Sequence, residues 1–256
     1  AALGCKTIAP SDVAIDLGKH SKLFSRPKVM SEADIQDVIQ RFAVTACRAA
    51  KAGFSGIQIH AAHGYLISQF LSPLTNQRTD QWGGSLENRS RILVEIINAV
   101  RSSVPKEIAV AVKLNSADFQ RGGFSLDDAI EVVKRLNSLQ VDLVELSGGS
   151  YESPAMLGHS ASGQTLAREA YFLEFAKKIA SVATMPIMTT GGIRRHCIAQ
   201  KVLEQGVDVV GIATALACEP TLPTVWRNTP LFETVVPNIR WKDKSLSGLA
   251  TMSVVK

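Results

Sequence analysis

The chain has 256 residues, of which 46% are hydrophobic, and a formal net charge of +5. This length is enough for one large hydrophobic core and is typical of a single α/β-barrel domain. The basic residues are dispersed, without a run of five or more, which argues against nucleic acid as a partner. No apolar run approaches 18 residues, so the sequence predicts neither a membrane-spanning helix nor a signal peptide.

Amphipathic helices alternate with short apolar segments along the chain. The spacing of apolar residues predicts helices over 32–51, 85–101, 126–139 and 169–182, with Ser85 as an N-cap. Five apolar segments between and after the helices predict strands at 56–60, 108–114, 141–146, 186–190 and 207–213. Nearly continuous apolar strands between helices indicate a parallel sheet buried on both faces.

Repeated strand–helix units predict an α/β fold of the (β/α)8 TIM-barrel type, with five of its eight strands visible in this chain. A doubly wound open sheet is the alternative. That fold is typically marked by a Gly-x-Gly-x-x-Gly turn after an early strand, and the sequence has none. We expect one domain over 1–256, shortened at its N-terminal side, with 221–256 as a C-terminal tail.

The cysteines are far apart and form no Cys-x-x-Cys pair, so a zinc or iron–sulfur site held by cysteines is not expected. They are Cys5, Cys47, Cys197 and Cys218. This usage favours a reduced, cytoplasmic setting. Apart from His60 and His63, the histidines are His20, His159 and His196, and they show no metal-ligand spacing either. No metal site is predicted.

His60, His63 and Tyr65 follow the first of the five strands, in the segment HAAHGY. Active-site groups of a barrel lie at the C-terminal ends of its strands, so this position favours chemistry. The three side chains could grip a substrate oxygen, bind a metal or form a hydrogen-bonded structural cluster. Residue types alone leave these alternatives open.

Lys113 is a cation near the end of the otherwise apolar second strand. Burial without a partner is costly, so it should face an anionic group or an electron-rich ring. It could instead reach solvent, pair with a neighbouring carboxylate or form a Schiff base.

Gly191 and Gly192 follow the fourth strand, and Gly211 lies near the end of the fifth. Glycines after a strand let backbone N–H groups approach an anion, and barrels often bind phosphate with the loops after their last two strands. We therefore favour a phosphate site over two simple tight turns.

The segment HAAHGYLISQFLSPLTNQRTDQWGGSLENRSR resembles the Old Yellow Enzyme family of FMN-dependent NAD(P)H oxidoreductases, and the resemblance extends over about 31–220. It implies an eight-stranded barrel with FMN at its C-terminal mouth. It also implies that NAD(P)H reduces the flavin, which then passes hydride to an activated alkene (such as an enone), a quinone or a nitro compound.

The resemblance also implies roles for individual residues. His60 and His63 would hydrogen-bond the acceptor's oxygen, Tyr65 would donate a proton, and Lys113 would lie against the flavin pyrimidine edge. The expected phosphate loops are Gly191, Gly192 and Ile193, and Gly211, Ile212, Ala213 and Thr214. The polar stretch from Asn76 to Arg89 would be loop scaffold.

The chain departs from the family pattern in three respects. Thr214 stands near the usual position of an arginine that clasps the phosphate, so Arg194 or Arg195 would have to substitute. The family's first three strands would precede Ala1, and no cysteine cluster follows the last strand. Open sheet edges would favour a homo-oligomer. A non-catalytic or partner-requiring barrel fragment is therefore the alternative function, and a metal-dependent barrel hydrolase is a weaker one.

Overall fold

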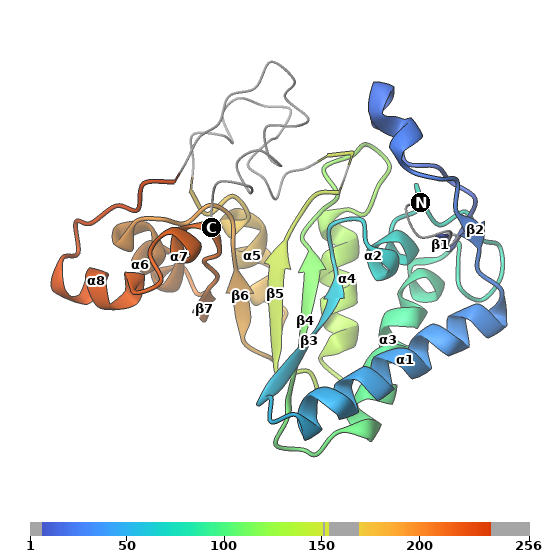
Figure 1. Cartoon of the computed structure of the whole chain (residues 1–256), viewed down its shortest axis with the longest axis horizontal. Coiled ribbons are helices and arrows are strands. Elements are labelled where there is room, and N and C mark those ends of the chain that lie inside the picture. The colour runs from blue at the N-terminus through green and yellow to red at the C-terminus, as the bar shows by residue number, and fades with distance from the viewer. Residues whose placement is uncertain (1–6, 151, 154–168, 237–256) are drawn as a thin grey trace.

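The computed structural model describes residues 7–150, 152–153 and 169–236. Its centre is a five-stranded parallel sheet in the order β3-β4-β5-β6-β7, so each strand pairs with the next strand along the chain (Figure 1). The strands are β3 (Gly56–Ala61), β4 (Ala109–Asn115), β5 (Leu143–Ser147), β6 (Ile187–Thr189) and β7 (Val209–Val210). All five predicted strands and their parallel direction are confirmed.

Helices connect consecutive strands, because a parallel pair needs a long crossover connection. The helices that precede, connect or follow the strands are α1 (Glu32–Lys51), α2 (Leu66–Leu71), α3 (Leu86–Ser103), α4 (Leu126–Leu136), α5 (Leu173–Ala180), α6 (His196–Glu204), α7 (Thr214–Cys218) and α8 (Leu222–Asn228). A short parallel pair, β1 (Ile8–Ala9) with β2 (Lys28–Val29), and the 3-10 helix η1 (Gly18–Leu23) precede them.

Side-chain caps fix where three helices begin. Ser31 and Ser125 each form a capping box with an aspartate three residues later, at the starts of α1 and α4. The predicted cap Ser85 accepts a hydrogen bond from the backbone N–H of Asn88 at the start of α3. These polar residues satisfy donors that the first helical turn leaves without a partner.

The fourth predicted helix begins four residues later than expected, at Leu173. Ala170 has φ 57°, in the left-handed region that a right-handed helix cannot contain. The side chain of Glu169 is used elsewhere, in hydrogen bonds to the loop before α6. The third helix is shorter than predicted and ends at Leu136, with Asn137 as its C-cap. The side chain of Asn137 donates to the carbonyl of Val182 and accepts from the backbone N–H of Thr184.

The two faces of the sheet differ in character. Alternate residues of β3, β4 and β5 are almost completely buried in the hydrophobic core that the helices complete, for example Ile59, Val112 and Leu146. The other face carries Gln58 and His60 on β3, which are exposed and half-buried respectively. The expectation that the strands are buried on both faces therefore holds for most of β5 but not for β3, where Gln58 is exposed.

The beginning of the predicted C-terminal tail packs on the core. Leu222 and Trp226 of α8 are buried, and the Trp226 indole N–H donates to the carbonyl of Phe232 at 3.1 Å. The tail residues 237–256 lie outside the described part of the chain. None of the described helices is long and apolar enough to cross a membrane.

Candidate functional site

Three aromatic side chains gather at the C-terminal end of β3. The ring centroid of His60 lies 5.1 Å from that of His63 and 4.9 Å from that of Tyr65, both in edge-on geometry. His60 lies at the end of β3, and His63 and Tyr65 lie in the turn that follows. The distances between the rings therefore depend on the backbone conformation of this turn. The structure thus brings together the three residues that were predicted to be catalytic.

The turn that carries these rings has an unusual backbone. His63 has φ 63° and Gly64 has φ 75°, and a left-handed conformation is costly for a residue with a side chain. The backbone N–H of His63 donates to the side-chain oxygen of Asn115 at 3.1 Å. Asn115 is buried at the end of β4 and donates to Asp118 and to the carbonyl of Gly149. Neighbouring strands therefore hold the turn in place.

Both histidines are neutral near pH 7. Burial, reinforced by the positive charge of Lys113, lowers the pKa of His60 and brings that of His63 to about 4. The Nδ1 atom of His60 accepts a hydrogen bond from the N–H of Ala62 at 3.2 Å, which leaves the proton on Nε2 as a donor. His63 Nε2 lies 2.7 Å from the hydroxyl oxygen of Ser147 at the end of β5.

Lys113 pairs with a buried carboxylate on the next strand. Its Nζ lies 2.6 Å from Oε1 of Glu145, and the amide of Gln58 donates to Oε2 at 2.9 Å. Glu145 is 6% exposed, so its charge is nearly removed from water. The sequence allowed four interpretations of Lys113. In the structure it pairs with a neighbouring carboxylate.

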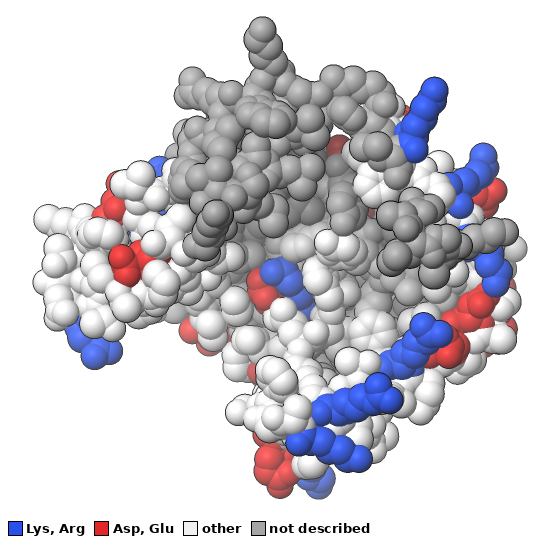
Figure 2. All heavy atoms as spheres, viewed as in Figure 1, with Lys and Arg blue, Asp and Glu red and all other residues white. Residues whose placement is uncertain are grey.

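Charged side chains are rare on the strands of the sheet. Lys113 and Glu145 are the only charged residues on β3 to β7. In Figure 2 a basic and an acidic group meet in the middle of the face that overlies these strands, bordered by uncharged atoms. Over α1, in contrast, charged side chains are frequent, with acidic groups toward its start and basic groups toward its end (Figure 2).

The two predicted phosphate loops follow neighbouring strands at the same end of the sheet. β6 and β7 pair in parallel, with Thr189 opposite Val210. The loop after β6 contains Gly191, Gly192 and Ile193, and the loop after β7 contains Gly211, Ile212 and Ala213 and leads into α7 at Thr214. Both loops therefore open toward the end of the sheet at which His60 and Lys113 lie.

Gly192 is required by packing as well as by conformation. It has φ 71°, and a Cβ there would lie 2.4 Å from the hydroxyl oxygen of Tyr171. A Cβ on Gly191 would likewise lie 2.8 Å from the backbone nitrogen of Tyr171. Sequence reasoning did not find Tyr171, since nothing in its own segment indicates that it folds back over these glycines.

The loop before α6 is held by Glu169. Its carboxylate accepts hydrogen bonds from the backbone N–H groups of Arg194 and Arg195 at 3.0 and 3.2 Å. It also pairs with both guanidinium groups, through Nε atoms at 3.3 and 2.7 Å. Arg194 and Arg195, which were expected to substitute for a phosphate-binding arginine at Thr214, are thus engaged by a buried carboxylate in this structure.

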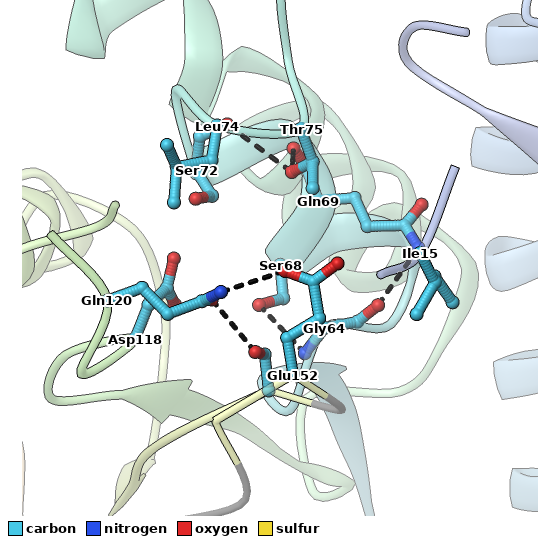
Figure 3. Close-up of a pocket in the computed structure, with 11 residues that line it drawn as sticks. Ile15, Gly64, Ser68, Gln69, Ser72, Leu74, Thr75, Asp118, Gln120 and Glu152 are labelled. Atoms are coloured by element: carbon cyan, nitrogen blue, oxygen red, sulfur yellow. Dashed lines mark hydrogen bonds between the residues drawn. The ribbon is translucent and has the colours of Figure 1, made fainter. Parts of the chain in front are cut away.

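A small pocket of about 50 Å³, partly open to solvent, lies beside Gly64 at the same end of the sheet (Figure 3). Its walls come from α2, the loops after β4 and β5, and Ile15. Gln120 donates to Glu152 at 2.8 Å across this pocket, and Gln69 donates to the carbonyl of Gly64. The remaining lining residues are Ser68, Ser72, Leu74, Thr75, Asp118 and Ser150. Most of the pocket's lining surface is apolar, although many of its lining residues are polar, and the pocket is adjacent to the ring cluster.

The polar stretch after α2 is held by internal hydrogen bonds. Asn76 is buried and donates to the carbonyls of Phe70 and Trp82. Arg78 pairs with Asp80 and donates to the carbonyl of Met30 at 2.6 Å. These contacts agree with a scaffold role. Among the described residues, no group of three or more His, Cys, Asp or Glu side chains could hold a metal ion.

Comparison with known proteins places this geometry in a family. The family model described as "NADH:flavin oxidoreductase / NADH oxidase family" matches residues 6–228. An NADH-dependent flavin oxidoreductase, iliE, of Neonectria sp. (strain DH2) is 39% identical over 260 residues, which cover 95% of this chain and 34% of the relative. An NADPH dehydrogenase of Geobacillus thermodenitrificans is 39% identical, with 84% of this chain and 59% of the relative covered.

Solved structures of similar fold agree with this family match. A 2-naphthoyl-CoA reductase complex superposes with a TM-score of 0.79 at 29% identity, covering 87% of this chain and 33% of that one. The Old Yellow Enzyme homologue of Zymomonas mobilis gives 0.72 at 26% identity, covering 91% and 64%. The chain spans about a third to three-fifths of the length of the two curated relatives above. By the extent of the family match, the chain belongs to the NADH:flavin oxidoreductase / NADH oxidase family.

Proposed function

We propose that this protein uses FMN and NAD(P)H to reduce a small-molecule acceptor, and that residues 1–256 belong to one FMN-binding barrel domain. FMN, when bound, would take hydride from NAD(P)H and deliver it to the acceptor. The proposed acceptors are enones, quinones and nitro compounds. The observation that carries the proposal is the cluster of His60, His63 and Tyr65 beside Lys113, at the end of the sheet where barrel enzymes place their sites.

The chain's residues fit such a cofactor in their chemistry. Backbone N–H groups of the loops 191–193 and 212–214 suit a phosphate, whereas the Gly211 N–H is already bonded to the carbonyl of Thr189. The glycines of the first loop leave room for the Tyr171 side chain that packs against them. Lys113 offers a cation for the flavin ring's pyrimidine side. These residues would hold the cofactor while His60 and His63 face the acceptor.

Neutral histidines suit an oxygen that gains negative charge. A neutral imidazole can donate an N–H hydrogen bond to that oxygen and keep its proton. An oxyanion hole requires such a donor. The Nε2–H of His60 serves this role because its Nδ1 already accepts from Ala62. We assign Ser147 as the donor to His63 Nε2, so that His63 keeps its proton on Nδ1 for the acceptor.

Tyr65 would supply the proton that completes the reduction. Its side chain is 47% exposed and lies edge-on to His60, close to where an oxygen held by the histidines would lie. A phenol in that position can act as a general acid toward the carbon next to the acceptor's carbonyl. The adjacent pocket beside Gly64 would accommodate the remote part of the acceptor. Cys47, Cys197 and Cys218, the cysteines in the described part of the chain, are free, which suits a cytoplasmic location.

The test begins with a visible absorption spectrum of the purified protein, before and after FMN addition and desalting. Retained flavin bands that bleach with NADH or NADPH, and return when an enone, quinone or nitro compound is added, are the expected result. A protein that retains no flavin, or whose bound flavin neither reductant bleaches, would overturn the proposal.

A further inference from the structure

Glu145 stands out because nothing in the proposed function requires it. Its carboxylate is among the least exposed in the described structure, at 6%. A carboxylate so far from water is stable only when a partner offsets its charge and donors satisfy its oxygens. Lys113 serves Oε1 and Gln58 serves Oε2, so both oxygens are used.

The pairing is built into the sheet. Lys113 and Glu145 lie directly opposite each other in the β4–β5 register, and His60 lies opposite Lys113 in the β3–β4 register. Neighbouring residues in register place their side chains on the same face of a sheet. The ladder therefore aligns a histidine, a cation and an anion in one row across three strands.

We infer that Glu145 is a positioning residue that anchors the Lys113 ammonium and offsets its charge, thereby lowering the reduction potential of the bound flavin. This inference rests on the proposed function. An uncompensated cation beside the flavin would favour its reduced, negatively charged form, whereas a neutral pair favours it much less. Glu145 thus keeps the bound flavin a stronger reductant than Lys113 alone would allow.

The row also connects Glu145 with His60. The groups that face the His60 ring are His63, Tyr65, Lys113 and Glu145. Lys113 acts to lower the pKa of His60, and Glu145 acts to raise it. The pKa of His60 therefore depends on the charges of Lys113 and Glu145, even when no flavin is present.

The variant Glu145→Gln tests the inference because it removes the charge and keeps the side chain's size. In the FMN-loaded protein, the affinity for reduced over oxidised flavin should rise at least tenfold, a positive shift of about 30 mV for a two-electron couple. The double variant Lys113→Gln with Glu145→Gln restores neutrality. Its ratio of affinities for reduced and oxidised flavin should return to within about threefold of the parent's.

A matched control is Glu131→Gln. Glu131 forms an ion pair of the same 2.6 Å length with Lys134, but on the exposed surface of α4. The control changes the net charge identically, and the flavin affinity ratio should not change, because solvent screens exposed charges. A shift as large as that of Glu145→Gln would show a general charge effect and overturn the inference.

A second readout uses the flavin-free protein. NMR titration of the His60 ring should show its proton dissociation constant rising at least threefold in Glu145→Gln and unchanged in Glu131→Gln. An unmoved His60 titration in a folded variant would overturn the role of Glu145. A moved titration with no flavin binding in any variant would contradict the proposed function while supporting the electrostatic role. A moved titration with an unchanged flavin potential would overturn the flavin part.

Discussion

The side-chain oxygen of Asn115 accepts the backbone N–H of His63 at 3.1 Å, and so ties a left-handed residue after β3 to the end of β4. The buried Asn115 is in turn held by Asp118 and Gly149, two further points after β4 and β5. The position of His63 is thus set by three strand ends together. The ring of His63 is also largely shielded from water, which lowers its pKa.

The shielding of His63 makes stability depend on pH. Its pKa falls from 6.5 to about 4 on folding, mainly through burial. As the pH drops below about 6.5 the unfolded state takes up the proton first, so stability declines until about pH 4 and this contribution then levels off. We expect roughly 1–2 kcal/mol of stability to be lost between pH 7 and pH 5, after discounting for partial exposure of the ring.

Urea unfolding of the parent and of His63→Asn at both pH values measures this effect. Asparagine tolerates the left-handed backbone better than most residues, so the variant should fold. Its stability should change less between pH 7 and pH 5 than that of the parent. Equal losses in the two proteins would mean that His63 does not carry the pH dependence.

Loss of the histidine pair should weaken acceptor-like ligands and spare the flavin. We expect His60→Ala with His63→Ala to weaken the binding of a phenolic ligand by about 10- to 100-fold, because two hydrogen bonds to the ligand's oxygen are removed. FMN affinity should stay within about threefold, since the proposed phosphate loops are on other strands. Titration of the flavin spectrum measures both affinities, and an unchanged phenol titration would contradict the assignment.

Removal of the Tyr65 hydroxyl should affect only one half of the reaction. Tyr65→Phe should slow the reduction of an enone by about 100-fold or more, as loss of a general acid does. Reduction of the bound flavin by NAD(P)H should keep its rate, because no proton from Tyr65 enters that step. Stopped-flow measurement of the two half-reactions checks this, and an equal slowing of both would exclude Tyr65 as the proton donor.

The contact between Gly192 and Tyr171 predicts an unusually sensitive glycine. Gly192→Ala adds a Cβ 2.4 Å from the Tyr171 hydroxyl oxygen at a residue with φ 71°. Gly84→Ala is the matched control, because Gly84 has φ 79° but no atom within 4 Å of the added Cβ. Both changes impose a backbone cost of about 1 kcal/mol, and the first adds the steric cost.

Chemical denaturation of the two alanine variants separates these costs. Gly192→Ala should lose more free energy of unfolding than Gly84→Ala by roughly 1–3 kcal/mol, the usual range for an overpacked contact. It should also weaken FMN binding, whereas the control should not. Two variants of equal stability would show that Tyr171 moves away without cost.

The sequence predicts most of the fold because its signals are local. The helix over 32–51 is bounded by the capping serine and by Gly53, and its observed ends match the prediction. The fourth helix was misplaced because Glu169 bonds to residues 25 and 26 positions away, a contact that no local pattern contains.

The candidate site was only partly predictable for the same reason. The cluster in HAAHGY is contained in six residues, so the sequence identifies it. The partner of Lys113, Glu145, lies 32 residues away in the next strand. One signal was available: Glu145, one of two acids in 141–146, and Lys113, the lone cation in 108–114, come into register once the two strands are aligned in parallel. Asn115 offered no such signal.

The β ladder becomes shorter along the sheet, and this affects where the molecule opens. The β3–β4 pairing extends from Gly56 to Ala61, whereas the β6–β7 pairing contains only Met188 with Val209 and Thr189 with Val210. Amide hydrogens should therefore exchange with solvent most slowly around β4 and fastest around β7. The half of the site that carries the histidines is the rigid half, and the loops proposed for the phosphate lie where a cofactor would add the most order.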